Sequence, residues 1–454
     1  MPTSPHAEQA DPADVDWLLS ADGIAVLDEV AGRLARGEDE LAVGSRVRAA
    51  GVPPARAALV LDAAATRSRA VGAGYPDAAR LVLLRTALEQ ASAPAVARHR
   101  AGRLAGAASG SGPLGGAVVD LCCGAGLDAA EIAAACGPTV GVDLDPVRVR
   151  LAAHTARVRD VPLVVHEGDA LSPPVPVAGR LVHVDPGRRD GRGRRARTLA
   201  THAPPVGALL AGLLGGGERA AGVGVVVTPG VDLSDPDLPA GAELEFVAVG
   251  GALTEATLWL GDLRGRVDGT PVLARATELG GGPDTRVTLA RTGPPVELPV
   301  AGMGGWLLEV APAAVRARLH GQLGAEVGAR RVARRRALLT CDEPPAPSPW
   351  WRVGEVEAVL APRARDVRRW LRTAPELPVE VVVHGLDVDV PAFLRELGQP
   401  PRGPGGRRLH LVRLDETAVC VATRPPRDRS ERAGTSATDP DGTSGCPGGP
   451  NVPM

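Results

Sequence analysis

Hydrophobic and polar positions follow two different patterns along this chain. Between residues 14 and 108, apolar residues recur every three or four positions, which is typical of amphipathic helices. From residue 117 onward, short apolar runs of strand length alternate with helical segments. The pattern predicts a helical region, followed by a parallel sheet with crossover helices.

The alternating part of the chain specifies individual elements. Five parallel strands are expected, at 117–121, 139–144, 163–169, 180–186 and 223–230. Helices are expected near 127–136 and over 146–159. The runs 243–251 and 254–261 are separated only by Ala252 and Leu253, which predicts an antiparallel hairpin at the end of the sheet. A smaller hairpin is expected from 271–279 and 284–291.

A second change of composition falls near residues 291–305. Beyond it, short apolar runs and helical patterns predict a compact α+β unit that includes a helix at 312–326 and ends in a hairpin. We therefore divide the chain into a helical region (1–108), a sheet domain (109–300), a small α+β domain (301–425) and a tail (426–454). The tail is rich in Pro, Gly, Ser, Thr and Asp, and we expect it to be disordered.

The composition excludes several classes of binding and catalytic site. The chain has 454 residues and a formal net charge of -2, so its overall charge gives no signal for nucleic acid or membrane. All 51 basic residues are arginine. Without lysine there is no Walker A phosphate loop, no pyridoxal Schiff base and no Ser-Lys dyad.

Cysteine and histidine spacing gives no metal-binding signature. The six cysteines lie at positions 122, 123, 136, 341, 420 and 446, without a CxxC pair, and the histidines form no HxxxH or HxH pair. We expect no metal site. The acidic N-terminus does not resemble a signal peptide, and no uninterrupted apolar run is long enough to span a membrane. A reduced cytoplasmic protein is the simplest expectation; the oligomeric state stays open.

The stretch VVDLCCGAGLDA, residues 118–129, carries the main candidate site. It predicts a strand, a glycine loop with Gly124 and Gly126, and a helix, so backbone N–H groups would face a ligand. Asp143 ends the next strand, where a carboxylate can bind ribose hydroxyls, and Asp169 ends the third. Cys122 is interpreted as a small residue lining the loop, with a reactive thiol or a metal role as the alternative.

Nicotinamide cofactors and S-adenosylmethionine (SAM) both suit such a loop, and two features favour SAM. Asp120 lies directly before the loop, where its carboxylate would repel a pyrophosphate but can organise the methionine end of SAM. The antiparallel hairpin after parallel strands also resembles the class I methyltransferase sheet. We therefore expect an α/β, Rossmann-like class I methyltransferase fold with SAM as its cofactor.

The candidate acceptor site follows the fourth strand in HVDPGRRDGRGRR, residues 183–195. Asp185 and Pro186 match the start of the Asp/Asn/Ser-Pro-Pro-aromatic motif of amino-group methyltransferases, and we take them as catalytic candidates. Gly187 replaces the second proline. The candidate phosphate-binding residues that follow are Arg188, Arg189, Arg192, Arg194 and Arg195. A solvated loop is the alternative. A second arginine run, 329–336, is either a solvated helix end or part of the same nucleic-acid surface.

The arrangement resembles a family of bacterial SAM-dependent methyltransferases with a C-terminal THUMP-like domain. Four stretches carry the resemblance: TALEQASAPAVARHRAGRL, VVDLCCGAGLDA, HVDPGRRDGRGRR and HGLDVDVPAFLREL. The central block is more distantly similar to trimethylguanosine synthases, although their SPPW-type motif is missing.

This resemblance implies methyl transfer from SAM to RNA. Asp120, Cys122, Gly124, Gly126, Asp143 and Asp169 would line the cofactor site, and the THUMP-like domain would bind the RNA. Two alternatives remain open: a methyltransferase acting on a protein or a small molecule, and a non-catalytic RNA-binding protein with a degenerate methyltransferase fold.

Overall fold

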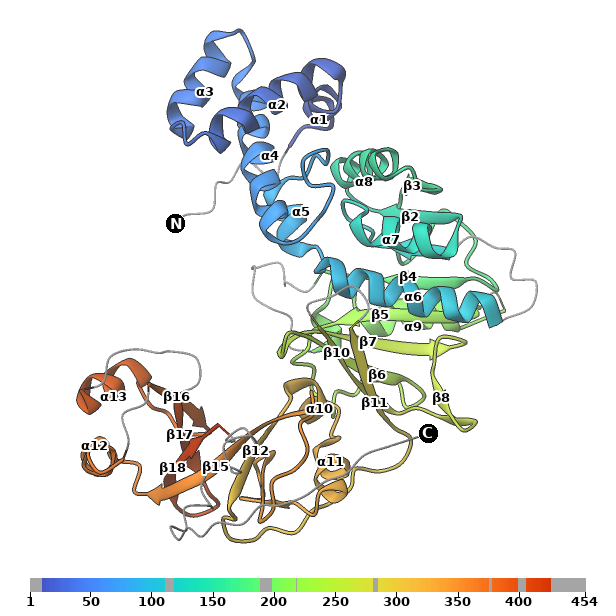
Figure 1. Ribbon diagram of the computed structural model, residues 1–454. Coiled ribbons are helices and arrows are strands. Elements are labelled where there is room, and N and C mark those ends of the chain that lie inside the picture. The colour runs from blue at the N-terminus through green and yellow to red at the C-terminus, as the bar shows by residue number, and fades with distance from the viewer. Residues whose placement is uncertain are drawn as a thin grey trace, which may run out of the picture. The chain divides into compact units, whose positions relative to one another are not determined.

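The computed structural model describes residues 10–110, 118–187, 198–217, 219–280, 285–374, 378–398 and 406–425. The chain forms two compact units (Figure 1). Unit 1 contains Met1–Glu297 together with Ala311–Leu323, and unit 2 contains Leu298–Val310 together with Gly324–Met454. The tail expected at 426–454 lies outside the described residues.

The N-terminal region of unit 1 is helical, as its periodicity predicts. Its helices are α1 (Pro12–Leu18), α2 (Ala21–Ala35), α3 (Glu40–Ala49), α4 (Pro54–Gly72), α5 (Arg85–Gln90) and α6 (Pro94–Gly110). Asp11, Ser20 and Asp39 accept backbone N–H bonds at the starts of the first three, satisfying donors that a helix leaves unpaired. Their apolar faces share one core with Leu127 and Leu151 from the sheet domain. These helices therefore pack directly against the segments that carry the glycine loop.

Unit 1 is built around a nine-stranded sheet of order β11-β10-β6-β7-β5-β4-β1-β2-β3. Its strands are β1 (Val118–Leu121), β2 (Thr139–Asp143), β3 (Leu163–Glu167), β4 (Leu181–Val184), β5 (Gly222–Val227), β6 (Glu243–Val249), β7 (Ala252–Gly261), β10 (Ala274–Leu279) and β11 (Arg286–Arg291). The first five are mutually parallel, and β7 is antiparallel to both β5 and β6. The α/β sheet with its antiparallel hairpin is confirmed. Chain order reverses between β1 and β4, and ligands of such sheets bind at this point.

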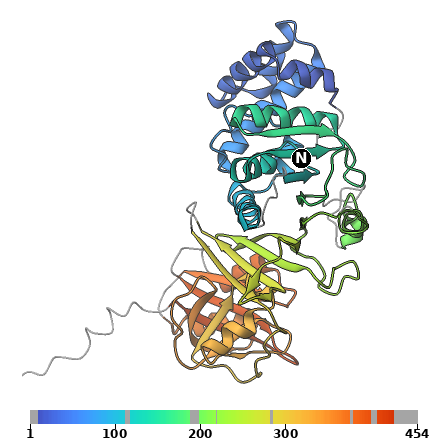
Figure 2. The same cartoon turned by 90° about the vertical axis from the view of Figure 1, so that its right-hand side faces the viewer.

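Helices connect the parallel strands. They are α7 (Leu127–Cys136), α8 (Pro146–Arg159), the short 3-10 helix η2 (Leu199–Thr201) and α9 (Val206–Leu214). The ranges expected for α7 and α8 are confirmed. In Figures 1 and 2, α7 and α8 lie close to β2 and β3, and α6 runs beside α7.

One detail of the hairpin region differs from the sequence prediction. The turn between β6 and β7 is Gly250–Gly251, both with positive φ, whereas Ala252 and Leu253 belong to β7. Glycine adopts this conformation without a Cβ clash, so it takes the turn. The second predicted hairpin is confirmed as the antiparallel pair of β10 and β11, and β10 also pairs in parallel with β6, so this hairpin extends the main sheet. A two-residue ribbon, β8 (Arg266–Val267) with β9 (Thr270–Pro271), lies between the two hairpins in sequence.

A buried polar network joins α6 to the antiparallel end of the sheet. Glu245 is fully buried and accepts bonds from His99, Arg103, Trp259 and Thr277. Burial alone would raise the pKa of Glu245, but His99, Arg103 and Thr277 outweigh it and hold this pKa well below the ordinary value. The network replaces water with fixed partners, so the carboxylate stays charged inside the protein.

This network predicts a specific acid sensitivity. The folded pKa of Glu245 is depressed, so its stabilising contribution is present above the unfolded pKa, near 4.5, and is lost as pH falls toward the folded pKa. Glu245→Gln should therefore destabilise most at neutral pH, and the difference from wild type should shrink below pH 4.5. Urea unfolding as a function of pH measures this. A difference independent of pH would contradict the assignment.

Unit 2 contains a seven-stranded sheet of order β13-β14-β12-β15-β18-β17-β16. Its strands are β12 (Trp306–Val310), β13 (Arg330–Arg331), β14 (Leu338–Cys341), β15 (Trp351–Leu360), β16 (Val379–His384), β17 (Arg407–Arg413) and β18 (Ala418–Arg424). Helices α12 (Ala364–Leu371) and α13 (Val390–Leu397) pack on one face, against residues such as Leu409 and Leu411. The final hairpin, β17–β18, is as the sequence predicts.

Two expectations near the unit boundary are wrong. The helix expected at 312–326 is two helices, α10 (Pro312–Arg316) and α11 (His320–Glu326), interrupted at Arg318, which has φ +55°. The arginine run 329–336 is not a helix end, because Arg330 and Arg331 form strand β13. Arg330 forms a two-point ion pair with Asp342, so this arginine is already occupied within the unit. Among the described residues, no helix combines the length and the apolar character needed to cross a membrane.

Candidate functional site

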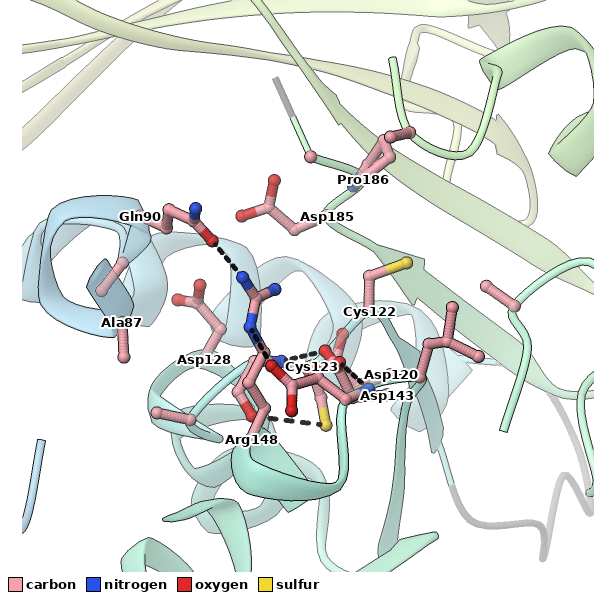
Figure 3. Close-up of a pocket in the computed structure, with 18 of the residues that line it drawn as sticks. Ala87, Gln90, Asp120, Cys122, Cys123, Asp128, Asp143, Arg148, Asp185 and Pro186 are labelled. Atoms are coloured by element: carbon pink, nitrogen blue, oxygen red, sulfur yellow. Dashed lines mark hydrogen bonds and ion pairs between the residues drawn. The ribbon is translucent and has the colours of Figure 1, made fainter. Parts of the chain in front are cut away.

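A cavity of about 1090 Å³ lies at the carboxyl ends of the parallel strands of unit 1. The loops after β1, β2, β3 and β4 contribute to it, and α5 contributes Gln90 (Figure 3). The cavity is strongly acidic. Its carboxylate residues are Glu89, Asp120, Asp128, Asp143, Asp145, Asp169 and Asp185. Arg148 is the single arginine among the described lining residues, so the cavity favours a ligand with positive charge.

The glycine loop has the tight geometry that its sequence predicts. Gly126 has φ +74° and begins α7, and a Cβ there would lie 2.8 Å from Ala152 Cβ and 2.9 Å from Ala152 Cα. Thr155, one turn further along the same helix α8, donates its hydroxyl to the carbonyl of Ala125 at 2.8 Å. Gly124 has φ +56°, and a Cβ there would meet no atom within 4 Å. The loop thus contacts α8 at Gly126 and is open at Gly124.

Asp143 anchors the glycine loop to the end of β2. One carboxylate oxygen accepts the N–H of Gly124 at 2.8 Å, and the other accepts the N–H of Asp145 at 3.0 Å. The side chain is buried, yet the residue lines the cavity. Each oxygen retains a second lone pair, so the carboxylate can hold the loop and still accept a bond from a ligand.

Asp120 and His183 form a buried pair across adjacent strands. They are direct register partners on β1 and β4, and His183 Nδ1 donates to Asp120 Oδ1 at 2.6 Å. Burial raises the pKa of Asp120. Burial would lower the pKa of His183, but the charge of Asp120 and this hydrogen bond keep it above the ordinary value. The remaining polar atoms, Asp120 Oδ2 and His183 Nε2, are buried and have no protein partner. Both residues line the cavity, so a bound ligand could satisfy them.

The two cysteines of the loop have different positions. Cys122 lines the cavity with φ +60°, a left-handed conformation that explains why glycine would suit this position (Figure 3). Burial, followed by the charges of Asp143 and Asp185, raises the pKa of the Cys122 thiol well above its usual value. A neutral thiol is a poor nucleophile and metal ligand, which favours the lining role. Cys123 is buried beneath the loop.

Two arginines connect the helical region to the cavity. Arg148 of α8 donates to the Gln90 side chain at 2.9 Å (Figure 3). Arg100 of α6 is 1% exposed and forms ion pairs with Asp128, at 2.8 Å, and with Glu255, at 2.5 Å. Asp128 lines the cavity from the first turn of α7. Helices α5 and α6, which precede the sheet, therefore supply Gln90 and Arg100 to these contacts.

The candidate acceptor residues lie beside the start of the glycine loop, because β4 pairs with β1 and Asp185 donates its backbone N–H to the carbonyl of Leu121 at 3.3 Å. Asp185 and Pro186 follow β4 and line the cavity (Figure 3). Gly187 donates its N–H to the carbonyl of Ala203 at 2.8 Å and accepts the N–H of Ala203 at 2.9 Å. A second proline could not donate this bond, which gives a physical reason for the departure from the Pro-Pro motif. Asp169 is exposed at the end of β3, and its carboxylate accepts the N–H of Leu171.

The predicted site residues fall into two groups. Asp120, Cys122, Gly124, Asp143, Asp169, Asp185 and Pro186 all line the cavity. Gly126 belongs to the same loop and contacts Ala152 of α8. The candidate phosphate-binding residues Arg188, Arg189, Arg192, Arg194 and Arg195 lie outside the described residues.

Sequence reasoning missed several residues that build the site: Gln90, Arg100, Asp128, Arg148 and His183. One of them carried a usable signal, because His183 and Asp185 are two apart on a strand and so face the same side. The arginines and Gln90 carried none, since their partners are distant in sequence.

Known proteins resemble both the sequence and the fold. Two relatives from Mycobacterium tuberculosis strains CDC 1551 and H37Rv, each described as an uncharacterized S-adenosylmethionine-dependent methyltransferase, are 32% identical to this chain over 329 residues. Each match covers 72% of this chain and 82% of the relative. Residues 11–70 match a domain of unknown function, DUF8688.

A crystal structure of a proposed methyltransferase from Porphyromonas gingivalis W83 has the same fold. Its TM-score is 0.63 at 17% identity, over 83% of this chain and 92% of that one. The acidic cavity at the strand ends and the glycine loop are consistent with the family indicated by the sequence match. This chain belongs to the S-adenosylmethionine-dependent methyltransferases.

Proposed function

We propose that this protein transfers the methyl group of SAM to a nucleophilic nitrogen or oxygen of an RNA base. The observation that supports the proposal is the acidic cavity, which Asp185 lines together with residues of the glycine loop. Its volume, about 1090 Å³, is at the upper end for ligand sites and suits a cofactor together with part of an acceptor.

The residues present fit a cationic cofactor. SAM supplies an electrophilic methyl group on a positively charged sulfonium, and the carboxylates of the cavity favour that charge. Asp120, whose buried Oδ2 has no protein partner, would bind the ammonium of the methionine portion. Asp143 would accept from the ribose and Asp169 would lie near the adenine edge. Gly124 leaves open space beside the loop, where a side chain would intrude.

On the acceptor side, Asp185 would orient the base by accepting its hydrogen bond, while Pro186 keeps the chain extended. Such orientation is the main contribution that a methyltransferase makes to a direct displacement. The arginines at 188–195 would bind the phosphates of the RNA backbone. The C-terminal unit, as a THUMP-like domain, would add RNA contacts.

Asp185→Asn separates acceptor orientation from cofactor binding. We expect methyl transfer to fall about 100-fold while the Kd for SAM changes little, since the carboxylate acts on the acceptor. Asp262→Asn, at an exposed position outside the cavity, is the matched control and should keep full activity. Radiolabelled SAM with total RNA measures transfer, and calorimetry measures binding. Equal activity of both variants would contradict the assignment of Asp185 to acceptor orientation.

The acceptor class is tested in cells. Mass spectrometry of nucleosides from strains with and without the gene should show one methylated nucleoside lost from tRNA or rRNA. Label from SAM should enter the RNA fraction of the deletion strain when purified protein is added. An unchanged nucleoside profile, with label in the protein or small-molecule fraction, would replace RNA by that acceptor.

A further inference from the structure

Three side chains that are distant in sequence meet on the second sheet. Glu309 of β12, His384 of β16 and His410 of β17 each offer a ligand atom, and these atoms all lie within 4.8 Å of one another. His384 Nε2 and His410 Nδ1 are 3.3 Å apart. We propose that Glu309, His384 and His410 form a binding site for a divalent transition-metal ion, with Zn²⁺ the expected occupant.

Strand register explains why the histidines converge. In the parallel pair β16–β17, His410 is opposite Val382, so His384 is its diagonal neighbour on the same face. Leu409 and Leu411 point to the opposite face and pack against the helices. The histidines therefore lie on the face without these helices, beside a second apolar cluster that includes Val412 and Val421. The apolar core beneath α12 and α13 contains neither histidine, so its packing does not explain the histidine pair.

The distance between the two imidazole nitrogens suits tetrahedral coordination. Two nitrogens bound to one Zn²⁺ at about 2.0–2.1 Å lie about 3.3 Å apart at the tetrahedral angle. Burial, followed by the nearby arginines, lowers the pKa of His384. Burial, followed by His384 and Arg408, lowers the pKa of His410 to about 3.

The surroundings of His410 are organised for a ligand at Nδ1. His410 is 2% exposed, and its Nε2 lies 3.0 Å from Thr423 Oγ1. A donor role for Nε2 leaves the lone pair of Nδ1 facing His384, which is the tautomer that coordination through Nδ1 requires. Glycine at position 354 leaves room for Thr423, because a Cβ there would lie 2.7 Å from the Thr423 hydroxyl. A supporting partner of this kind is usual behind a metal-bound histidine.

Glu309 supplies the anionic ligand, and Arg408 pairs with its carboxylate from outside the site. Arg408 also donates to Glu380 at 2.8 Å. Arg408 is therefore balanced by two carboxylates and can hold one oxygen of Glu309 while the other turns toward the metal. Glu309 and His384 are partly exposed, which provides an entry path. Two histidines, one glutamate and an open fourth position match the ligand set of zinc sites that keep a bound water.

The full-length chain, stripped with EDTA and returned to chelator-free buffer, is titrated with Zn²⁺ and, in parallel, with Co²⁺. We expect one Zn²⁺ per chain and visible Co²⁺ bands of a four-coordinate site without a thiolate charge-transfer band. His384→Ala should weaken Zn²⁺ binding by at least about 100-fold, exceeding the loss from an outer partner. His166→Ala removes an exposed histidine of unit 1 and should leave the Kd unchanged.

Thr423→Val is a second variant that is expected to fold even if His384→Ala does not. It keeps the shape of a buried residue, removes the partner of His410 and should weaken Zn²⁺ binding about tenfold. Thermal unfolding without metal identifies variants that fold, and Zn²⁺ should raise the Tm of wild type but not that of His384→Ala. Absence of Zn²⁺ uptake by wild type overturns the proposal. Equal Kd values for His384→Ala and His166→Ala, or a thiolate band with Co²⁺, also overturn it.

Discussion

Gly126→Ala is expected to destabilise unit 1 by about 2–5 kcal/mol and to weaken SAM binding. The residue has φ +74° and ψ 15°, so any side chain adds the strain of a left-handed conformation, about 1–2 kcal/mol. The new Cβ would also lie 2.9 Å from Ala152 Cα, in backbone that cannot rotate away, and such overpacking costs about 1–3 kcal/mol. The strain is relieved only by moving the glycine loop off α8. Urea unfolding and calorimetry with SAM measure the two effects.

Gly398→Ala is the matched control for this substitution. Gly398 has φ 68° and ψ 24° at the end of α13, nearly the same backbone conformation, but a Cβ there would meet nothing within 4 Å. It should cost only the conformational strain, about 1–2 kcal/mol, and leave SAM affinity unchanged. Equal losses in the two variants would show that contact with Ala152 contributes nothing.

Arg100→Met should destabilise the protein by about 3–5 kcal/mol. Arg100 is 1% exposed and compensates Asp128 and Glu255, so its removal leaves two carboxylates in a buried site without their cation. Burial alone would raise the pKa of Asp128, and Arg100 is the main group that keeps it below the ordinary value. Asp128 should therefore gain a proton in the variant, and SAM affinity should fall with the lost charge.

Arg98→Met provides the comparison on the same helix. Arg98 is exposed on α6, and its loss should change the free energy of unfolding by less than about 0.5 kcal/mol. Adding Glu255→Gln to Arg100→Met should recover part of the lost stability, because it removes one stranded charge. A double variant no more stable than Arg100→Met would show that packing, and not charge, explains the loss.

The acidic lining also bears on product release. Methyl transfer removes the positive charge of the sulfonium, so the carboxylates that favour SAM give no such advantage to the demethylated product. Asp120 is buried and Asp128 is partly buried. Their partners His183 and Arg100 set how much negative charge these two carboxylates present to the cavity. Arg100 thus connects the helical region before the sheet to a carboxylate of the cavity lining.

Local patterns identified the elements of both units well. The parallel strands, α7 and α8 follow directly from short apolar runs and helical periodicity, and so does the final hairpin β17–β18. The errors fell where local signals conflict with backbone conformation. Gly250–Gly251 took the turn that was assigned to Ala252–Leu253, because only glycine enters the left-handed region without strain. Arg318 interrupts a helix whose apolar pattern is continuous, because its positive φ lies outside the helical region of backbone conformation.

The sequence by itself determined the fold class, the glycine loop and the acids at the strand ends, since each of these depends on residues close in the chain. The partners of those acids were decided only by the tertiary structure. Arg100 reaches Glu255 across 155 residues, and His183 reaches Asp120 across 63. The cluster of Glu309, His384 and His410 likewise exists only after strand pairing, because register and not spacing brings its atoms within 4.8 Å. Local sequence encodes backbone conformation, whereas burial and long-range pairing set the charge and ligand chemistry of a site.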